Sequence, residues 1–440
     1  MPKLVLVNPV NSARTGLTVN KDSRFPPISL GIVAALTPAD WEVTLLDENW
    51  ETFAYQDADL VGITAFTASA NRAYEIASLY RRCSIPVVMG GIHASMCTEE
   101  ALQYVDAVVV GEAETTWPQL IADFSKGELQ QVYRGELSDL QGLPQPRRDL
   151  FHPQYQFASV QTSRGCPMDC EFCSVTPFNG HRYRRRPVNE VLEELETIPQ
   201  KMIFFVDDNL IGYGKAGQEQ AMALFRGIVE RKLEKWWFCQ ASLNFADDEE
   251  ILHWAGRAGC KMVFLGLESD DADGLAEVNK KLNLKRGVDA YDHAFRRIHQ
   301  AGISVLGAFI LGMDNDTPKK LHQRADFMIR SGIDVMQTTY LTPLPGTRLF
   351  ELYQSEDRLR FTNFPDDWDH YDMTEVIYHP KQMSFAELAS ISRDIGRRIY
   401  AKPILFRKAL RTYRETRDFV ATMFSWNSNQ VYRDVNRASA

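Results

Sequence analysis

The chain has 440 residues, of which 45% are hydrophobic and 24% are charged, a balance typical of a globular protein with two or three domains. Its formal net charge of −9 argues against a general nucleic-acid binder, so we expect no nucleic-acid partner. No stretch has the character of a signal peptide or a transmembrane helix, and most of the seven cysteines are isolated, so we expect a cytoplasmic protein.

Residues 1–135 alternate predicted strands with predicted helices. Strands are expected at "KLVLVNP", "EVTLLDEN", "ADLVGITAFT", "IPVVMGGIHAS" and "DAVVVGEAE", and helices between them, as at "ISLGIVAALTP" and "ANRAYEIASLYRRC". This order predicts a parallel, doubly wound, Rossmann-like α/β sheet. Ligands of such sheets bind beyond the carboxyl ends of the strands. The residues expected there are Thr64, Thr67, Gly90, Gly91, His93, Gly111 and Glu112.

A polar, proline-containing linker is expected at residues 136–155, and a second alternating series at 156–375. Its six strands are predicted at "FASVQTSRG", "MIFFVDDNL", "WWFCQASLN", "MVFLGLES", "SVLGAFILG" and "VMQTTYLTPLPGT". This series predicts a partial or full TIM-like barrel, with its chemistry at the carboxyl ends of the strands. Residues 376–440 form a helical region of mixed charge, which favours an amphipathic cap on the barrel over a nucleic-acid surface.

Three cysteines crowd into "SRGCPMDCEFCS", directly after the first strand of the second series. Cys166, Cys170 and Cys173 offer three thiolates from one loop. A structural zinc ion takes four ligands, and His181 is the only further candidate ligand nearby in the sequence. A disulfide between two of the cysteines would leave the third thiol unpaired. An iron–sulfur cluster takes thiolates, and three of them on a cluster of four irons leave one iron open. These cysteines are therefore the predicted metal ligands and catalytic centre.

The Cys-x-x-x-Cys-x-x-Cys loop, with Phe172 beside its last cysteine and a barrel-like series after it, resembles the radical SAM superfamily. The resemblance implies a 4Fe-4S cluster whose open iron binds S-adenosylmethionine (SAM), with Phe172 among the cofactor-binding residues. An electron from the reduced cluster then cleaves SAM to methionine and a 5′-deoxyadenosyl radical. It also implies an electron donor, a reductase or a flavodoxin or ferredoxin.

Polar residues at later strand ends can be read against the same family. The resemblance implies that Asp207, Asp208 and Asn209 hold the ammonium of SAM, although Asp and Asn also suit a helix N-cap. Gln240 and Ser242 follow the third strand, where relatives often carry an arginine for the SAM carboxylate. The run Arg184 to Arg186 could substitute for that arginine, or could be a solvated loop. Glu268, at the fourth strand's end, suits the ribose hydroxyls.

The domain before the barrel resembles the cobalamin-binding class of the superfamily. The resemblance is carried by "PPISLGIVAAL", "VGITAFT", "VMGGIHAS" and "VVVGEAE". It implies a corrin between the two domains, near the cluster, with glycines that let its nucleotide tail approach the backbone. The cobalt-ligating Asp-x-His-x-x-Gly motif is missing, because "NPVNSARTG" follows the first strand. His93 is either a hydrogen-bonded loop residue or a cobalt ligand.

Three functions remain open. The first is a cobalamin-dependent radical SAM methyltransferase acting on an unactivated carbon or a phosphinate phosphorus of a small-molecule substrate. The second is a radical SAM enzyme of the same architecture that catalyses cyclisation, oxidation, rearrangement or 3-amino-3-carboxypropyl transfer, with no cobalamin bound. The third is an iron–sulfur or zinc scaffold without catalysis. The loop "WDHYDMTEVIYHP", with Trp368, His370 and Tyr371, either lines the substrate pocket or is structural.

Overall fold

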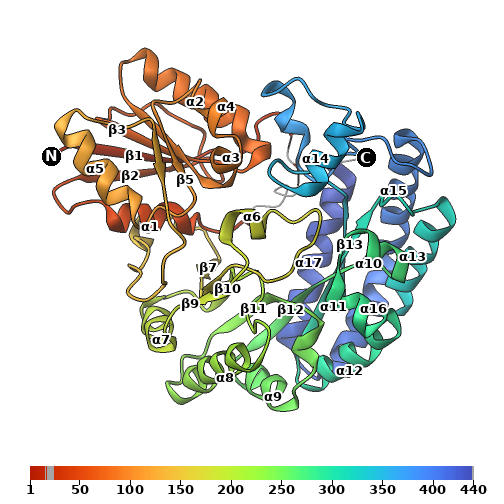
Figure 1. Cartoon of the computed structure of the whole chain (residues 1–440). Coiled ribbons are helices and arrows are strands. Elements are labelled where there is room, and N and C mark those ends of the chain that lie inside the picture. The colour runs from red at the N-terminus through yellow and green to blue at the C-terminus, as the bar shows by residue number, and fades with distance from the viewer. Residues whose placement is uncertain (15, 17–23, 439–440) are drawn as a thin grey trace.

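The computed structural model describes residues 1–14, 16 and 24–438, and it contains two α/β units followed by three helices (Figure 1). The first unit is built on a six-stranded sheet of order β2-β1-β3-β4-β5-β6, in which every neighbouring pair is parallel. Its strands are β1 Lys3–Asn8, β2 Glu42–Asp47, β3 Leu60–Thr64, β4 Val87–Gly90, β5 Ala107–Val110 and β6 Val132–Arg134.

Helices cover both faces of this sheet, because successive side chains of a strand point to opposite faces. Val5 and Val7 of β1 belong to the buried cluster that includes helix α2, whereas Leu4 and Leu6 pack with helices α1 and α5. The doubly wound prediction is therefore confirmed. The helices of this unit are α1 Ile28–Leu36, α2 Ala70–Arg82, α3 Gly91–Met96, α4 Thr98–Ala101 and α5 Thr116–Lys126.

The second unit is a six-stranded parallel sheet of order β14-β13-β12-β11-β10-β7. Its edge strands β7 and β14 do not pair with each other in the described part of the chain, so the barrel is partial. The strands are β7 Phe157–Val160, β10 Met202–Phe205, β11 Trp236–Ala241, β12 Cys260–Glu268, β13 Ser304–Leu311 and β14 Val335–Tyr340. The helices between them are α7 Val188–Thr197, α8 Lys215–Glu230, α9 Glu249–Arg257, α12 Tyr291–Gln300 and α13 Pro318–Arg330.

Several short elements lie around the strand ends, where the sequence pattern predicted only loops. They form the walls of the site described below. They are the antiparallel pair β8 Ser163–Arg164 and β9 Arg184–Arg185, and the helices α6 Val175–Asn179, α10 Ala272–Glu277, α11 Lys281–Arg286 and α14 Arg348–Ser355. Single 3-10 turns are η3 Thr67–Ser69, η4 Arg148–Leu150, η5 Leu243–Ala246, η6 Val288–Ala290 and η7 Asp366–His370.

The C-terminal region is helical, as predicted, and consists of α15 Phe385–Ile399, α16 Lys402–Thr416 and α17 Phe419–Ala438 (Figure 1). Helix α17 packs on the face of the second sheet opposite to α8, α9 and α12. There the Phe424 ring lies 6.0 Å from the Phe157 ring, and Asn429 donates a 2.9 Å hydrogen bond to the Asp334 carbonyl. Among the described helices, none is both long and apolar enough to cross a membrane.

Candidate functional site

The three clustered cysteines lie on one tightly folded loop between β8 and α6, and all three are free thiols. Gly165 opens the loop at φ +88°, and a Cβ there would lie 2.2 Å from the Arg182 carbonyl oxygen, so only glycine fits. The Cys166 amide donates to the Gly180 carbonyl at 3.1 Å, and the Cys173 amide to the Cys170 carbonyl at 3.2 Å. The backbone thus holds the thiols in a fixed arrangement at the end of the first barrel strand.

The residues fit an iron–sulfur cluster. Burial raises the pKa of each thiol, that of Cys173 to about 12, so they become thiolate ligands only when a cation binds beside them. No group of three or more His, Cys, Asp or Glu among the described residues is arranged to hold one metal ion. In a cluster each thiolate binds a different iron, so three separate thiols of one loop suit a cluster.

The three polar residues after β10 divide into different roles. Asp207 is fully buried and accepts hydrogen bonds from the Thr162 amide at 3.0 Å and the Ser163 hydroxyl at 2.7 Å, so it holds the strand ends together. The assignment of Asp207 to the SAM ammonium therefore does not fit. Asp208 is half-buried, and desolvation together with Asp207 raises its pKa to about 6. Asp208 keeps the role of a carboxylate close to the cysteine loop.

Asn209 presents an unused hydrogen-bond acceptor. Its amide nitrogen donates to the Ser242 hydroxyl at 3.2 Å, and that hydroxyl lies 2.5 Å from the Tyr213 hydroxyl. The Asn209 side-chain oxygen is buried without a partner in the described part of the protein. A buried acceptor without a partner is costly, so a ligand ammonium is a fitting occupant. Gln240 is half-buried on β11, two residues before Ser242.

A largely buried ion pair at the end of β12 was not predicted from the sequence. Glu268, whose backbone has a φ of +63°, forms this ion pair with the Lys280 ammonium at 2.8 Å. Burial disfavours the charge on Lys280, but Glu268 and Cys170 outweigh it and hold its pKa above the ordinary value. Lys280 lies between the short helices α10 and α11, which the sequence pattern did not predict. Its position beside the cysteine loop therefore depends on the tertiary fold.

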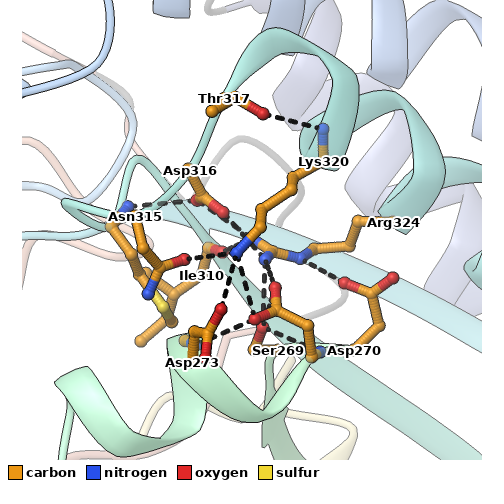
Figure 2. Close-up of polar contacts among 12 residues, drawn as sticks. Ser269, Asp270, Asp273, Ile310, Asn315, Asp316, Thr317, Lys320 and Arg324 are labelled. Carbon is orange, nitrogen blue, oxygen red and sulfur yellow. Dashed lines mark hydrogen bonds and ion pairs between the residues drawn. The ribbon is translucent and has the colours of Figure 1, made fainter.

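A fully buried arginine fixes the ends of β12 and β13 (Figure 2). The Arg324 guanidinium makes five hydrogen bonds, one for each of its N–H groups. Its partners are Asp270 Oδ1 at 2.9 Å, the Ile310 carbonyl at 2.8 Å, Asp316 Oδ2 at 3.0 Å, Asp316 Oδ1 at 2.8 Å and Ser269 Oγ at 3.0 Å. Because Asp316 also accepts from the Gly312 and Met313 amides, this network shapes the glycine-containing end of β13.

The basic run after the cysteines joins the two units. Arg184 pairs with Glu112 at 2.5 Å, and Arg164 with the same carboxylate at 3.3 Å. Arg186 pairs with Glu194 at 2.5 Å. Arg184 and Arg186 are therefore committed to protein carboxylates and do not support the prediction of a SAM-binding arginine in this run. Arg185 lies over the Tyr183 ring at 5.5 Å, and for this residue the role stays a prediction. Glu112, predicted to contact a cofactor, is likewise occupied by an ion pair between the units.

A cleft opens between the strand ends of the first sheet and the elements β8 and α6 that flank the cysteine loop. Of the residues predicted at these strand ends, Thr64, Gly90, Gly91, Gly111 and Glu112 line it. Phe178 and Asn179 of α6 form part of the opposite wall. The cleft continues into an apolar slot between the sheet and helices α1 and α5, lined by Leu6, Gly62, Val88, Val109 and Trp117. Its glycine edge and apolar depth fit a large flat ring with a pendant group.

His93 and Thr67 are not in this cleft, so their prediction as cofactor-binding residues is not supported. His93 is fully buried, with its Nε2 atom 3.0 Å from the Tyr74 hydroxyl and 3.3 Å from Glu100 Oε1. Trp368 donates to the same Glu100 carboxylate at 3.0 Å. His93 is therefore the hydrogen-bonded residue of the two alternatives, and the loop around Trp368 packs against it as structure.

The neighbouring aromatic residues of that loop are also engaged within the protein. The Tyr371 hydroxyl donates to the Phe361 carbonyl at 2.8 Å. His370 stacks on the Phe361 ring and lies 2.8 Å from the Glu375 carboxylate. These contacts support the structural interpretation of "WDHYDMTEVIYHP". The strand β1 is followed by a segment that is described only in part, since residues 15 and 17–23 of "NPVNSARTG" and its continuation lie outside the described residues.

Together these features define a two-domain cofactor enzyme, with a loop of three cysteines at the head of a partial barrel and a cleft between that barrel and a doubly wound domain. Residues 160–328 match the Radical SAM superfamily model, and residues 14–121 match the B12 binding domain model. Bacteriochlorophyllide d C-12(1)-methyltransferase of Chlorobaculum tepidum is 30% identical over 90% of this chain and 87% of its own length. The chain belongs to the radical SAM superfamily, in its cobalamin-dependent methyltransferase class.

Further relatives share this architecture. The hopanoid C-2 methylase of Rhodopseudomonas palustris is 30% identical over 76% of this chain and 65% of its own length. The methyltransferase TsrM of Kitasatospora setae, solved with cobalamin and a [4Fe-4S] cluster, superposes with a TM-score of 0.72 at 17% identity, covering 99% of both chains. OxsB, solved with aqua-cobalamin and SAM, gives 0.70 at 17% identity, over 96% of this chain and 72% of its own. The resemblance inferred from the cysteine loop and the first domain is thus confirmed.

Proposed function

We propose that this enzyme transfers a methyl group to an unactivated carbon of an apolar small molecule. The observation that carries the proposal is the shared wall of the two cofactor sites. Helix α6 begins two residues after Cys173, and its Phe178 and Asn179 line the cleft that Gly90 and Gly91 border on the other side. A corrin in this cleft and a cluster on the cysteine loop would therefore be neighbours, as methyl transfer between them and a substrate requires.

The residue roles follow from the contacts. Cys166, Cys170 and Cys173 are proposed to bind the cluster. Bound together, the cluster, SAM and cobalamin supply the electron, the radical and the methyl group. The Asn209 side-chain oxygen accepts a hydrogen bond from the SAM ammonium. Lys280 supplies a positive charge for the SAM carboxylate, the role that the sequence suggested for Arg184 to Arg186.

The remaining polar groups hold this arrangement. Ser242 orients the Asn209 amide, and Glu268 holds the Lys280 ammonium with Oε1, which leaves Oε2 for a ribose hydroxyl. Asp208, Gln240 and Phe172 stay predicted cofactor-binding residues.

The substrate class is proposed from the relatives. The C. tepidum enzyme is named for a bacteriochlorophyllide and the R. palustris enzyme for a hopanoid, both large apolar ring systems. We propose an apolar ring-containing substrate for this chain too. A flavodoxin, a ferredoxin or a reductase is proposed as the donor of the electron that reduces the cluster. A phosphinate phosphorus remains the less favoured acceptor, because none of these names points to one.

The test is anaerobic purification with hydroxocobalamin, followed by iron and corrin analysis and by product analysis of SAM turnover. About four irons and one corrin per chain, with S-adenosylhomocysteine formed beside 5′-deoxyadenosine, are expected. Zinc in place of iron would contradict the proposal.

A reaction without methyl transfer is the second candidate. It is favoured by the anaerobic magnesium-protoporphyrin IX monomethyl ester cyclase of Cereibacter sphaeroides, which is 25% identical over 79% of this chain. Formation of 5′-deoxyadenosine without S-adenosylhomocysteine would select this candidate, and methylthioadenosine would select 3-amino-3-carboxypropyl transfer. The same anaerobic turnover experiment therefore decides between the two reactions.

A further inference from the structure

Helix α11 presents a basic, partly apolar face to solvent directly beside the cysteine loop. Lys281, Leu284 and Lys285 lie three and four residues apart, which places them on one side of the helix. All three are exposed, Leu284 to 39% of its surface. The helix sequence "KLNLKR" contains no acidic residue, in a chain whose net charge is −9.

Two hydrogen bonds connect the start of this helix to the cysteine loop. The Asn279 side-chain amide donates to the Asp169 carbonyl at 2.5 Å, and the Glu171 backbone amide donates to the Val278 carbonyl at 3.2 Å. Asp169 and Glu171 flank Cys170 in sequence. The exposed face of α11 therefore begins two residues from groups that are hydrogen-bonded to the cysteine loop itself.

The acidic groups around this face are already paired. Arg348 forms ion pairs with Asp169 at 2.6 Å and with Glu171 at 2.7 Å. The exposed His181 and Arg182 follow Gly180, whose carbonyl accepts a hydrogen bond from the Cys166 backbone amide of the cysteine loop. The positive charges of the surface are thus left to face solvent.

We propose that Lys281, Leu284, Lys285, His181 and Arg182 form the docking surface for a small acidic protein that carries one electron. The proposal rests on the proposed function, since it assigns a partner to the same cluster. The docked carrier is oxidised by one electron and the cluster is reduced by that electron, with no bond formed at the contact. Opposite charges accelerate such encounters, and an exposed leucine within a charged rim supplies the short-range apolar contact.

The test compares two reductants on the full-length enzyme with its cluster. A reduced bacterial flavodoxin must dock, whereas dithionite is small and needs no docking surface. The Lys281→Glu/Lys285→Glu variant changes the local charge by −4, and Lys126→Glu/Lys402→Glu, on α5 and α16, changes it equally elsewhere. The readouts are the rate of cluster bleaching and the rate of 5′-deoxyadenosine formation, each measured across ionic strength.

The flavodoxin-driven rate of the α11 variant should fall about tenfold at low salt and lose most of its salt dependence, while its dithionite-driven rate stays within about twofold of wild type. Leu284→Ser should lower the flavodoxin-driven rate without altering the salt dependence. Equal effects in the control variant, an unchanged flavodoxin-driven rate, or equal losses with both reductants would overturn the docking surface. Failure of dithionite to support SAM cleavage in the wild type would instead refute the proposed function, and the docking surface with it.

Discussion

Replacing Arg324 with methionine should destabilise the protein strongly, because the change strands buried carboxylates. Both Arg324 and Asp316 are 0% exposed in their side chains, and the two are joined at 2.8 Å (Figure 2). Removing one partner of such a pair leaves an uncompensated charge in a region that excludes water. We expect a loss of about 3–5 kcal/mol in the free energy of unfolding.

The assay is guanidinium unfolding followed by circular dichroism. Arg397→Met serves as the matched control, since Arg397 pairs with Asp394 at 2.9 Å while 74% exposed, and an exposed pair is worth less than about 1 kcal/mol. The double variant Arg324→Met/Asp316→Asn should recover about 1–2 kcal/mol, because the stranded charge is removed as well. An Arg324→Met protein within 1 kcal/mol of wild type, on the order of the control's effect, would refute the reasoning.

Three further predictions concern the cysteines, the cleft and a buried histidine. Replacing any one of Cys166, Cys170 and Cys173 with alanine should abolish cluster-dependent SAM cleavage. The control variant Cys83→Ala, at an exposed site on the first domain, should retain SAM cleavage. Full activity in any one of the three single variants would exclude this loop as the cluster site. Gly90→Leu should reduce the amount of bound corrin without changing the unfolding midpoint. Gly90 has an ordinary φ of −135° and a Cβ there would meet only Val109, at 3.8 Å, so the larger side chain fits without strain and enters the cleft. A normal corrin content would show that the cleft is not the binding site. His299 lies 2.7 Å from Asp334, and its pKa is raised to about 9 by Asp334 and Glu415, although burial acts in the opposite direction. The protonated side chain therefore stabilises the fold by about 3 kcal/mol. This stabilisation is complete below the unfolded pKa of about 6.5 and is lost as the pH rises through about 9. The His299→Gln protein should lack this alkaline loss in unfolding measurements between pH 6 and about pH 10, and an identical pH profile would contradict the assignment.

The sequence predicted the fold well where local patterns decide it. Alternating buried strands and amphipathic helices were enough to predict both parallel sheets, and the position of three cysteines after a strand was enough to place their loop at the head of the barrel. Strand ends also predicted the border of the cleft, because Thr64, Gly90, Gly91 and Gly111 end parallel neighbours of one sheet. Such features depend on residues close together in the chain.

The sequence did not predict which polar residues would be free for a ligand. Asp207 and Asp208 are neighbours of the same type, yet Asp207 is fully buried and accepts hydrogen bonds from Thr162 and Ser163, whereas Asp208 is only half-buried. Arg184 belongs to an exposed-looking basic run, yet it pairs with Glu112, 72 residues earlier. Lys280 meets Glu268 through two short helices without periodicity. These outcomes depend on contacts between distant segments, which a single sequence does not display.

The position of α17 has a consequence for how the protein is made. Met262, Leu306 and Val335 pack on one side of the second sheet with Phe424 and Tyr432, which come from the last helix of the chain. During synthesis, those strand residues leave the ribosome well before the helix that covers them. The growing chain must therefore carry an uncovered apolar sheet face until α17 emerges, and such a face favours aggregation while it is exposed.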